Sequence, residues 1–174
     1  MADQPDGIVL TRHRDLQGRQ WHPWARRSLV CLVALVLLLA LLGFVGQSTS
    51  TTKTDAAAAT LAVNAPSAVR GGLLYQSRFT IVAHQELKDA TLVLNEGWID
   101  GLTVNTIEPS PVNQASRNGD LALELGHLAP GAKYVLYMDY QVNPTTVGSR
   151  TLHLELDDGE QPVASLTRDL RIWP

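Results

Sequence analysis

The sequence is almost devoid of cysteine: one, Cys31, occurs among 174 residues. An intrachain disulfide is therefore excluded, and any folded domain must be held together by apolar burial and backbone pairing. Cys31 lies inside an apolar run, so it is a poor candidate for a nucleophile or metal ligand. We interpret it as a packing residue, with acylation near the inner membrane face as the alternative.

Motifs for catalysis and metal binding are also missing. No histidine pairs with a cysteine or with a second histidine at H-x-x-x-H spacing, which leaves a zinc site without support. Neither a G-x-S-x-G elbow nor a glycine-rich phosphate loop occurs. We therefore predict no catalytic residue, no cofactor, no small-molecule substrate and no enzyme activity; a catalytic site assembled from distant residues is the alternative. The histidines are His13, His22, His84, His127 and His153.

The chain has no strong excess of basic residues. Its net charge is −3, from 14 basic and 17 acidic side chains. Residues 1–27 carry five arginines and three aspartates, a net charge of +2, which leaves −5 for the remainder. A mildly acidic main body excludes the clustered basic surface that nucleic acid requires, so we predict no nucleic-acid binding.

One long apolar run is present, from Ser28 to Gly46, and it contains no charged residue. At ~1.5 Å per residue such a run spans ~26–28 Å as a helix, close to the hydrocarbon thickness of a bilayer. The sequence predicts a transmembrane helix over 28–46, centred on Leu29–Val45. A cleaved signal peptide is the alternative; the residues Gly46-Gln-Ser-Thr-Ser50 lack a clean small-x-small cleavage site of the Ala-x-Ala kind, which favours a lasting signal anchor.

The flanks of the run predict its orientation. Arg26 and Arg27 end an arginine-rich segment before it, and Lys53 is the first basic residue after it. The positive-inside rule then places the N-terminus in the cytoplasm and the C-terminal domain outside, anchored in the cell membrane and in contact with its lipid. Ala40, Gly43 and Gly46 form a stripe of small residues, a weak candidate surface for packing against another helix.

The rest of the chain divides into three parts by composition. Residues 1–27 are polar and contain Pro5 and Pro23, which predicts a disordered cytoplasmic tail. Residues 47–60 are rich in Ser, Thr and Ala without apolar periodicity, which predicts a flexible linker. Residues 61–174 form the predicted extracytoplasmic domain.

This outer domain shows a period of two. Apolar residues alternate with polar ones in several short runs, as expected for strands with one buried face. Turn signals such as Asn118-Gly119, Pro130-Gly131 and Asp158-Gly159 separate the runs. The pattern predicts an all-β fold, a two-sheet antiparallel sandwich. The runs are Leu73–Ala83, Ala90–Leu94, Leu102–Ile107, Leu121–Leu125, Tyr134–Val142, Leu152–Leu156 and a last strand within Val163–Ile172.

A local motif sharpens the fold prediction. Leu128-Ala-Pro-Gly-Ala-Lys-Tyr134 resembles the tyrosine corner of immunoglobulin-like and fibronectin type III-like domains. The resemblance implies an immunoglobulin-like sandwich in which the Tyr134 hydroxyl bonds back to nearby backbone at a crossover between sheets. The tryptophan and cysteine pair of antibody domains is absent.

Two longer segments, 89–109 and 141–148, carry a second resemblance. They are similar to small single-pass membrane proteins of high-GC Gram-positive bacteria, a family without an assigned activity. The resemblance implies a bacterial membrane protein whose partner is a YetF-like multi-pass membrane protein.

Two loops contain the remaining candidate sites. Asp157, Asp158 and Glu160 offer carboxylates that would suit calcium, although Asp-Gly between two alternating runs is also typical of a hairpin turn. Trp98, in the loop before Ile99, is either a lid over one end of the sandwich or an exposed anchor for a partner.

Exposed aromatic residues lead to the function prediction. We take Trp98, Ile99, Tyr137 and Trp173 as candidate partner contacts. A sandwich with no reactive cluster, tethered beside a membrane, favours a non-catalytic protein–protein interaction module, an accessory or assembly subunit of another integral membrane protein. A surface adhesin or a module that binds wall polymer or carbohydrate is the alternative.

Overall fold

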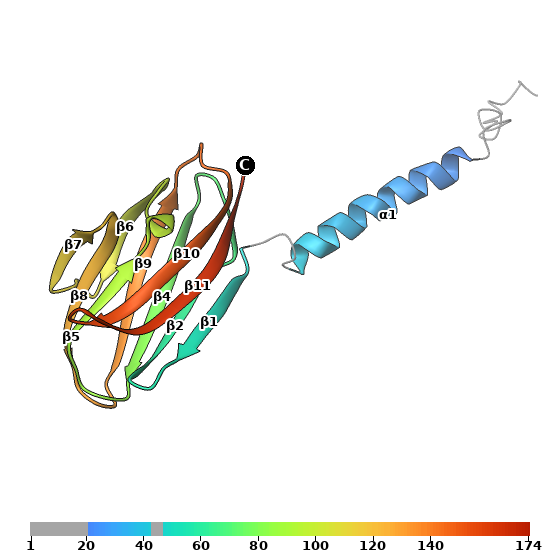
Figure 1. Ribbon diagram of the computed structural model, residues 1–174. Helices are drawn as coiled ribbons and strands as arrows, with labels where there is room; N and C mark the ends of the chain where they lie inside the picture. The colour runs from blue at the N-terminus through green and yellow to red at the C-terminus, as the bar shows by residue number, and fades with distance from the viewer. Residues whose placement is uncertain (1–20, 43–46) are drawn as a thin grey trace, which may run out of the picture. The chain divides into compact units, whose positions relative to one another are not determined.

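The computed structural model describes residues 21–42 and 47–174, which belong to two separate units, 1–46 and 47–174 (Figure 1). The first unit contains α1 (His22–Leu41), a helix of 20 residues with no buried side chain. By its length and apolar composition, α1 could cross a membrane.

The helix begins earlier than the sequence predicted. Residues 22–27 belong to α1, so the prediction of a disordered tail through residue 27 is wrong for this stretch. Pro23 lies in the first turn, where the amide hydrogen that proline lacks has no partner within the helix, and its fixed φ suits the helix start. Ala40 is exposed on α1, whereas Gly43, Gly46 and the predicted helix end lie outside the described residues.

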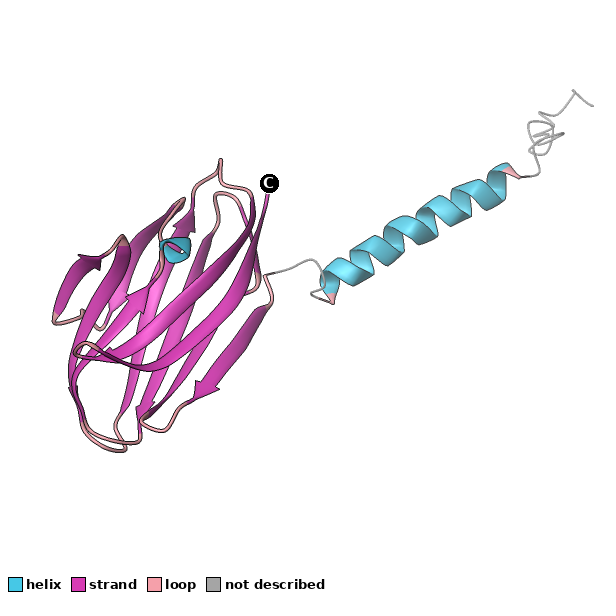
Figure 2. Ribbon diagram, in the orientation of Figure 1, coloured by secondary structure: helices cyan, strands magenta, loops and turns pink. Residues whose placement is uncertain are grey.

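The second unit is a β-sandwich (Figure 2). Sheet A has the strand order β1-β2-β4-β9-β6, and sheet B the order β3-β11-β10-β5-β8-β7. All neighbouring strands run antiparallel except β3, which is parallel to β11. In sheet A the strands are β1 (Thr49–Asp55), β2 (Ala59–Pro66), β4 (Leu74–Ala83), β6 (Leu102–Glu108) and β9 (Lys133–Val142). In sheet B they are β3 (Ala68–Arg70), β5 (Leu87–Leu94), β7 (Asn113–Arg117), β8 (Asp120–Leu128), β10 (Gly148–Asp158) and β11 (Gln161–Trp173).

The core lies between the two sheets and follows the predicted alternation. On β9, Leu136, Met138 and Tyr140 point inward and are fully buried. Leu152, Leu154 and Leu156 do the same from β10. Leu73 departs from the prediction: it precedes β4 and is 46% exposed, and the inward pattern on β4 begins at Tyr75.

The strand order confirms the immunoglobulin-like prediction. In sheet A, β2-β4-β9-β6 corresponds to the A-B-E-D sheet of a constant-type immunoglobulin domain, and in sheet B, β5-β10-β11 corresponds to C-F-G. Two additions extend this frame. The hairpin of β7 and β8 joins sheet B beside β5, and β1 joins sheet A beside β2.

The strand β1 corrects the prediction of a flexible linker over 47–60. Seven residues, Thr49 to Asp55, pair with β2, and β2 itself begins at Ala59. Arg168 on β11 holds this edge by donating hydrogen bonds to the carbonyl oxygens of Ser50 (3.4 Å) and Ala65 (2.8 Å). The β-branched threonines favour a strand, but all seven side chains of this edge strand are polar, so no alternation of apolar and polar residues was visible in the sequence.

Candidate functional site

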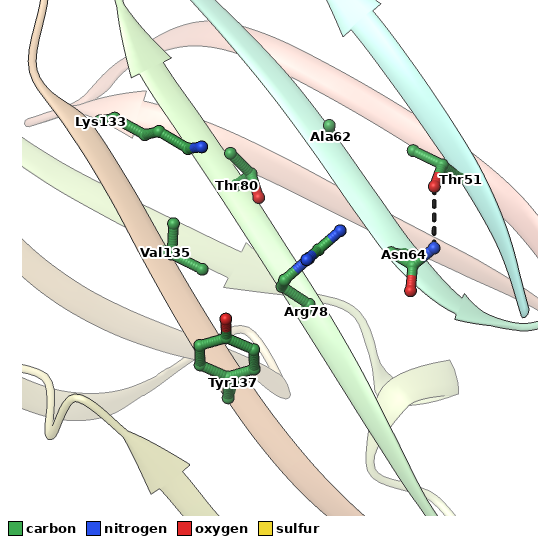
Figure 3. Close-up of a pocket in the computed structure, with 8 residues that line it drawn as sticks. All are labelled: Thr51, Ala62, Asn64, Arg78, Thr80, Lys133, Val135 and Tyr137. Atoms are coloured by element: carbon green, nitrogen blue, oxygen red, sulfur yellow. Dashed lines mark hydrogen bonds between the residues drawn. The ribbon is translucent and has the colours of Figure 1, made fainter.

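The outer face of sheet A is hollowed along its centre. Four adjacent strands, β1, β2, β4 and β9, turn their outward side chains into a shallow depression of about 300 Å³ (Figure 3). We call it the sheet A groove. Its lining residues are Thr51, Ala62, Asn64, Arg78, Thr80, Lys133, Val135 and Tyr137.

Strand register explains why these residues meet. Thr51, Asn64, Arg78, Tyr137 and Glu108 are successive cross-strand partners and form one row over all five strands of sheet A. Asn64 Nδ2 donates a hydrogen bond to Thr51 Oγ1 (2.8 Å), which fixes one end of the row. On β2, β4 and β9 the next row contains Ala62, Thr80 and Val135, whose short side chains leave the floor of the groove low, and Lys53 continues this row on β1.

Two cations in the groove have no carboxylate partner within the described residues. Carboxylate ion pairs there involve Lys53, Arg117 and His127, and neither Arg78 nor Lys133. In Figure 3 the Arg78 side chain reaches from β4 toward Asn64, and the Lys133 side chain reaches from β9 toward Thr80. Tyr137, 39% exposed, lies beside Arg78. This end of the groove is therefore a cationic surface with an accessible aromatic ring.

The hollow continues along β9 to an acidic end. Asp139 accepts hydrogen bonds from Gln76 Nε2 (2.9 Å) and Thr106 Oγ1 (2.6 Å). These two donors, Thr106 first, hold the pKa of Asp139 below its ordinary value, so the carboxylate stays charged at neutral pH. Glu108 lies opposite Tyr137 on β6. Two further depressions, which share Gln76 and Asp139, join the Tyr137 end of the groove to Leu74.

The groove and its continuation are elongated along β9 and differ in charge between their two ends. From Lys133 to Asp139 the strand covers six residue steps, or ~20 Å at ~3.3 Å per residue. One end is positive, the other negative, and Tyr137 lies between them. Such a surface fits an elongated segment that carries acidic residues at one end and basic residues at the other.

The structure decides between the two interpretations of Trp98. Its side chain is fully buried, with ring centroids 5.2 Å from Phe79 and 6.1 Å from Tyr140. Its indole nitrogen donates a hydrogen bond to the carbonyl oxygen of His153 (3.2 Å). The exposed-anchor interpretation is wrong, because the short 3₁₀ helix η2 (Glu96–Trp98) turns the ring into the core. Trp98 is the lid.

The other predicted contact residues stay accessible but are not brought together. Ile99 is half-buried and lines a small depression with residues of β7 and the β7–β8 turn. Tyr137 lies in the sheet A groove. Trp173, at the end of β11 in sheet B, is 53% exposed, with the Arg171 guanidinium 5.3 Å from its ring centroid.

The acidic loop forms a hairpin turn between β10 and β11. Asp158 pairs with Gln161 across the turn, and Gly159 has a φ of +66°, which suits glycine. Asp157 forms an ion pair with Arg117 (2.9 Å), and Asp158 Oδ1 accepts the backbone N–H of Asp89 (2.8 Å). Burial raises the pKa of Asp157 in spite of Arg117. Both aspartates therefore already have partners in the protein. In the parts of the chain that the structure describes, no three His, Cys, Asp or Glu side chains gather as a metal site.

Tyr134 lies where the chain crosses from β8 in sheet B to β9 in sheet A. Backbone hydrogen bonds fix this crossover: Gly131 N–H donates to Ala83 O (2.8 Å) and Ala132 N–H to Ala129 O (2.9 Å). The hydroxyl bond predicted for a tyrosine corner is absent from the described residues, and β9 corresponds to strand E, whereas a tyrosine corner lies at the start of strand F. Partial burial raises the pKa of that hydroxyl.

Sequence reasoning missed Arg78, Lys133, Asn64 and Asp139. All four occupy outward positions of strands, where single polar residues are ordinary. The signal that unites them is the register of three strands, β2, β4 and β9, which one sequence does not reveal.

Comparison with known proteins adds little to this description. No protein-family model matches the chain, and no curated protein sequence matches it. Among solved structures, the CARDB domain of the PF1109 protein from Pyrococcus furiosus, in complex with di-metal ions, is 15% identical, with a TM-score of 0.40, 71% of this chain and 88% of that chain covered.

Two further solved structures show a similarly distant likeness. CaCohA2 from Clostridium acetobutylicum is 13% identical, with a TM-score of 0.44, 61% of this chain and 85% of that chain covered. The human F-spondin reeler domain is 14% identical, with a TM-score of 0.39, 63% of this chain and 86% of that chain covered. These likenesses are too distant to support an argument about function.

Proposed function

We propose that this chain is a membrane-anchored, non-catalytic interaction module that binds another integral membrane protein through the sheet A groove. The groove carries the proposal: Arg78 and Lys133 without carboxylate partners in the described structure, beside the accessible ring of Tyr137. Arginine and tyrosine are among the side chains that dominate the binding energy of many protein interfaces.

The anchor in this proposal is α1. Its length and apolar composition suit a bilayer span, and Arg26 and Arg27 in its first turns favour a cytoplasmic N-terminus. The sandwich would then lie outside the cytoplasm. Trp24, whose ring lies 5.8 Å from the Arg27 guanidinium, has the amphipathic character of residues at the membrane interface.

The short connection between the two units favours a partner in the membrane. Eight residue steps separate Leu41, where α1 ends, from Thr49, where β1 begins. An extended chain spans ~3.3–3.6 Å per residue, so this connection reaches at most ~26–29 Å. The sandwich therefore stays beside the bilayer and would meet proteins embedded there, as an accessory or assembly subunit would. The sequence resemblance makes a YetF-like multi-pass protein the first candidate.

The charges of the groove favour a protein partner over an anionic wall polymer. A polyanion would be attracted by Arg78 and Lys133 but repelled by Asp139 and Glu108 at the other end. Like charges across an interface are unfavourable, whereas a protein segment of mixed charge satisfies both ends. This contrast separates the interaction module from the adhesin or wall-polymer alternative.

Site-specific photo-crosslinking tests the proposal. The full chain carries a photoreactive benzophenone amino acid at Tyr137 or, as the control, at Val112, which is 75% exposed and lies outside the groove. In native membranes, Tyr137 should give a discrete adduct with an integral membrane protein, and Val112 should not. A carbohydrate adduct at Tyr137 would support the wall-polymer alternative. Equal or absent adducts at the two positions would contradict a binding role for the groove.

A further inference from the structure

One end of the sandwich collects most of its exposed apolar side chains. In the described part of the domain, six large apolar side chains are exposed: Leu73, Leu74, Val112, Tyr137, Val147 and Trp173. Four of them, Leu73, Leu74, Val147 and Trp173, belong to neighbouring loops and strand ends. Their exposed fractions are 46%, 62%, 58% and 53%. We call this surface the apolar end.

Backbone contacts show that these residues are neighbours. Gly71 N–H donates a hydrogen bond to the carbonyl oxygen of Trp173 (2.8 Å), and Gly72 N–H donates to Val142 O (3.0 Å). A Cβ atom added at Gly71 would lie 3.1 Å from the carbonyl oxygen of Pro144, so the two loops pack tightly. Val147 directly precedes Gly148, which pairs with Ile172. In Figure 1 the β9–β10 loop and the C-terminus lie at the same end of the sandwich.

The chain enters the sandwich close to the apolar end. Ser67 N–H donates to Ser48 O (3.3 Å), and Arg171 N–H donates to Ser67 O (3.0 Å). From Ser67, the three residues of β3 lead directly to the loop before Leu73, a distance of ~10 Å at ~3.3 Å per residue. The eight residue steps from Leu41, where α1 ends, to Thr49 can span up to ~26–29 Å, which is more than this distance. The covalent connection therefore permits the apolar end to reach the surface of a bilayer that α1 crosses.

The chemistry of the apolar end suits the headgroup layer. Tryptophan with leucine and valine is the composition of interfacial segments, where aromatic rings lie at headgroup depth. Arg171 lies over the Trp173 ring, and Arg70 is the cross-strand partner of Trp173. Arg70 Nε donates to the Pro174 carbonyl oxygen (2.9 Å), which holds this second guanidinium beside the ring. Two arginines flanking an exposed tryptophan can contact anionic lipid phosphates.

We propose that the apolar end is a lipid-contact surface that rests on the headgroup layer of an anionic bilayer, so that the sandwich stands end-on upon the membrane. This inference depends on the membrane anchoring given under Proposed function. Strand β9 runs from Lys133, at the far end, to Val142 beside the apolar end. The acidic end of the sheet A groove would then lie nearer the lipid and the cationic end farther from it. A membrane partner would then contact the acidic end of the groove close to the lipid and the cationic end farther from it.

The test uses the full chain with Cys31→Ser and one new cysteine that carries the environment-sensitive dye NBD. The positions are Val147→Cys at the apolar end, Glu160→Cys in the hairpin at the opposite end, and Leu35→Cys in α1. Each variant is reconstituted into vesicles of phosphatidylcholine and phosphatidylglycerol that contain no other protein. The vesicles carry no nitroxide, headgroup-level nitroxide lipid, or, for the Leu35 position, nitroxide in the acyl chains. We expect blue-shifted, quenched emission at Val147 and water-like, unquenched emission at Glu160.

Each outcome has a distinct meaning. Water-like emission at Val147, equal to that at Glu160, overturns the lipid contact. If Leu35 is not quenched by nitroxides placed in the hydrocarbon core, the anchor itself fails, and with it the proposed function. Contact at Val147 in native membranes, but not in protein-free vesicles, would show that a protein, and not lipid, covers the apolar end.

A charge placed in the surface provides a second measurement. Leu74→Asp, in the Val147→Cys protein, should return the dye to water-like emission without lowering the melting temperature, because the Leu74 side chain is exposed. An unchanged lipid signal in this variant would overturn the assignment of the contact to the apolar end.

Discussion

Arg78 on β4 and Tyr137 on β9 are direct cross-strand partners on the outer face of sheet A. The same row places Asn64 on the other side of Arg78 and Glu108 on the far side of Tyr137. The direct cross-strand partners of Arg78 on both adjacent strands are thus neutral, and no carboxylate forms an ion pair with its guanidinium within the described structure. This arrangement distinguishes the groove from a solvated face whose charges are paired with one another.

Replacing Trp98 tests its role as a buried lid. Loss of a fully buried tryptophan from a packed core costs ~3–5 kcal/mol. For a domain of this size, the Trp98→Ala melting temperature should fall by ~10 °C or more, measured by circular dichroism of the full chain in detergent. Trp173→Ala is the matched control, and its effect should stay within ~0.5 kcal/mol because the ring is exposed. Equal melting temperatures for the two variants would contradict the lid.

Replacing Arg168 tests the attachment of β1. Arg168 is buried and donates to the carbonyl oxygens of Ala65 (2.8 Å) and Pro66 (3.0 Å), as well as to Ser50. Arg168→Met would leave these acceptors unpaired at a cost of ~1–3 kcal/mol. Backbone amides of β1 should exchange hydrogen faster. Arg171→Met, on the exposed side of the same strand, should leave β1 protected. Exchange in β1 that is fast already in the unmodified chain would favour the flexible linker instead.

The pKa of Asp139 should respond to Thr106. Because hydrogen bonds from Thr106 and Gln76 lower this pKa in the folded protein, they stabilise the fold above the unfolded value of the carboxyl group. That stabilisation is lost as pH falls through the lowered pKa. Thr106→Val should raise the Asp139 midpoint in an NMR titration and destabilise the fold at neutral pH more than in strong acid. A midpoint that does not move would contradict the role of Thr106.

Calcium titration tests the hairpin between β10 and β11. Asp157 pairs with Arg117 and Asp158 accepts the Asp89 amide, so calcium would have to displace protein partners. Isothermal calorimetry of the full chain should show no binding heat at millimolar calcium. Heat that disappears in Asp158→Asn would show that the loop binds calcium after all.

The strands were predictable where one face is buried and the other wet. The alternation of Leu152, Leu154 and Leu156 with polar residues predicts a strand, because the polar residues between them point to solvent. The same rule fails for β1, whose threonines are polar on both faces. The start of α1 was missed for a different reason: Pro23 suits the first turn of a helix as well as a helix break. Trp98 was undecided because burial of a loop residue depends on the loop's path. The groove was not predictable, since Arg78 and Tyr137 lie 59 positions apart in the chain and meet only through strand register.

Copurification from native membranes tests the central claim, binding of a membrane protein through the sheet A groove, most directly. Tagged full-length chain is compared with Arg78→Glu, Lys133→Glu and the matched control Lys88→Glu, an exposed charge on β5 of sheet B. If the cations face acidic groups of a partner, each groove variant should retain its fold and lose at least ~10-fold in recovered partner, equivalent to ~1.4 kcal/mol. Lys88→Glu should recover the partner in full. Recovery of the unmodified chain alone and monomeric in several mild detergents, or equal recovery by all variants, would contradict the account.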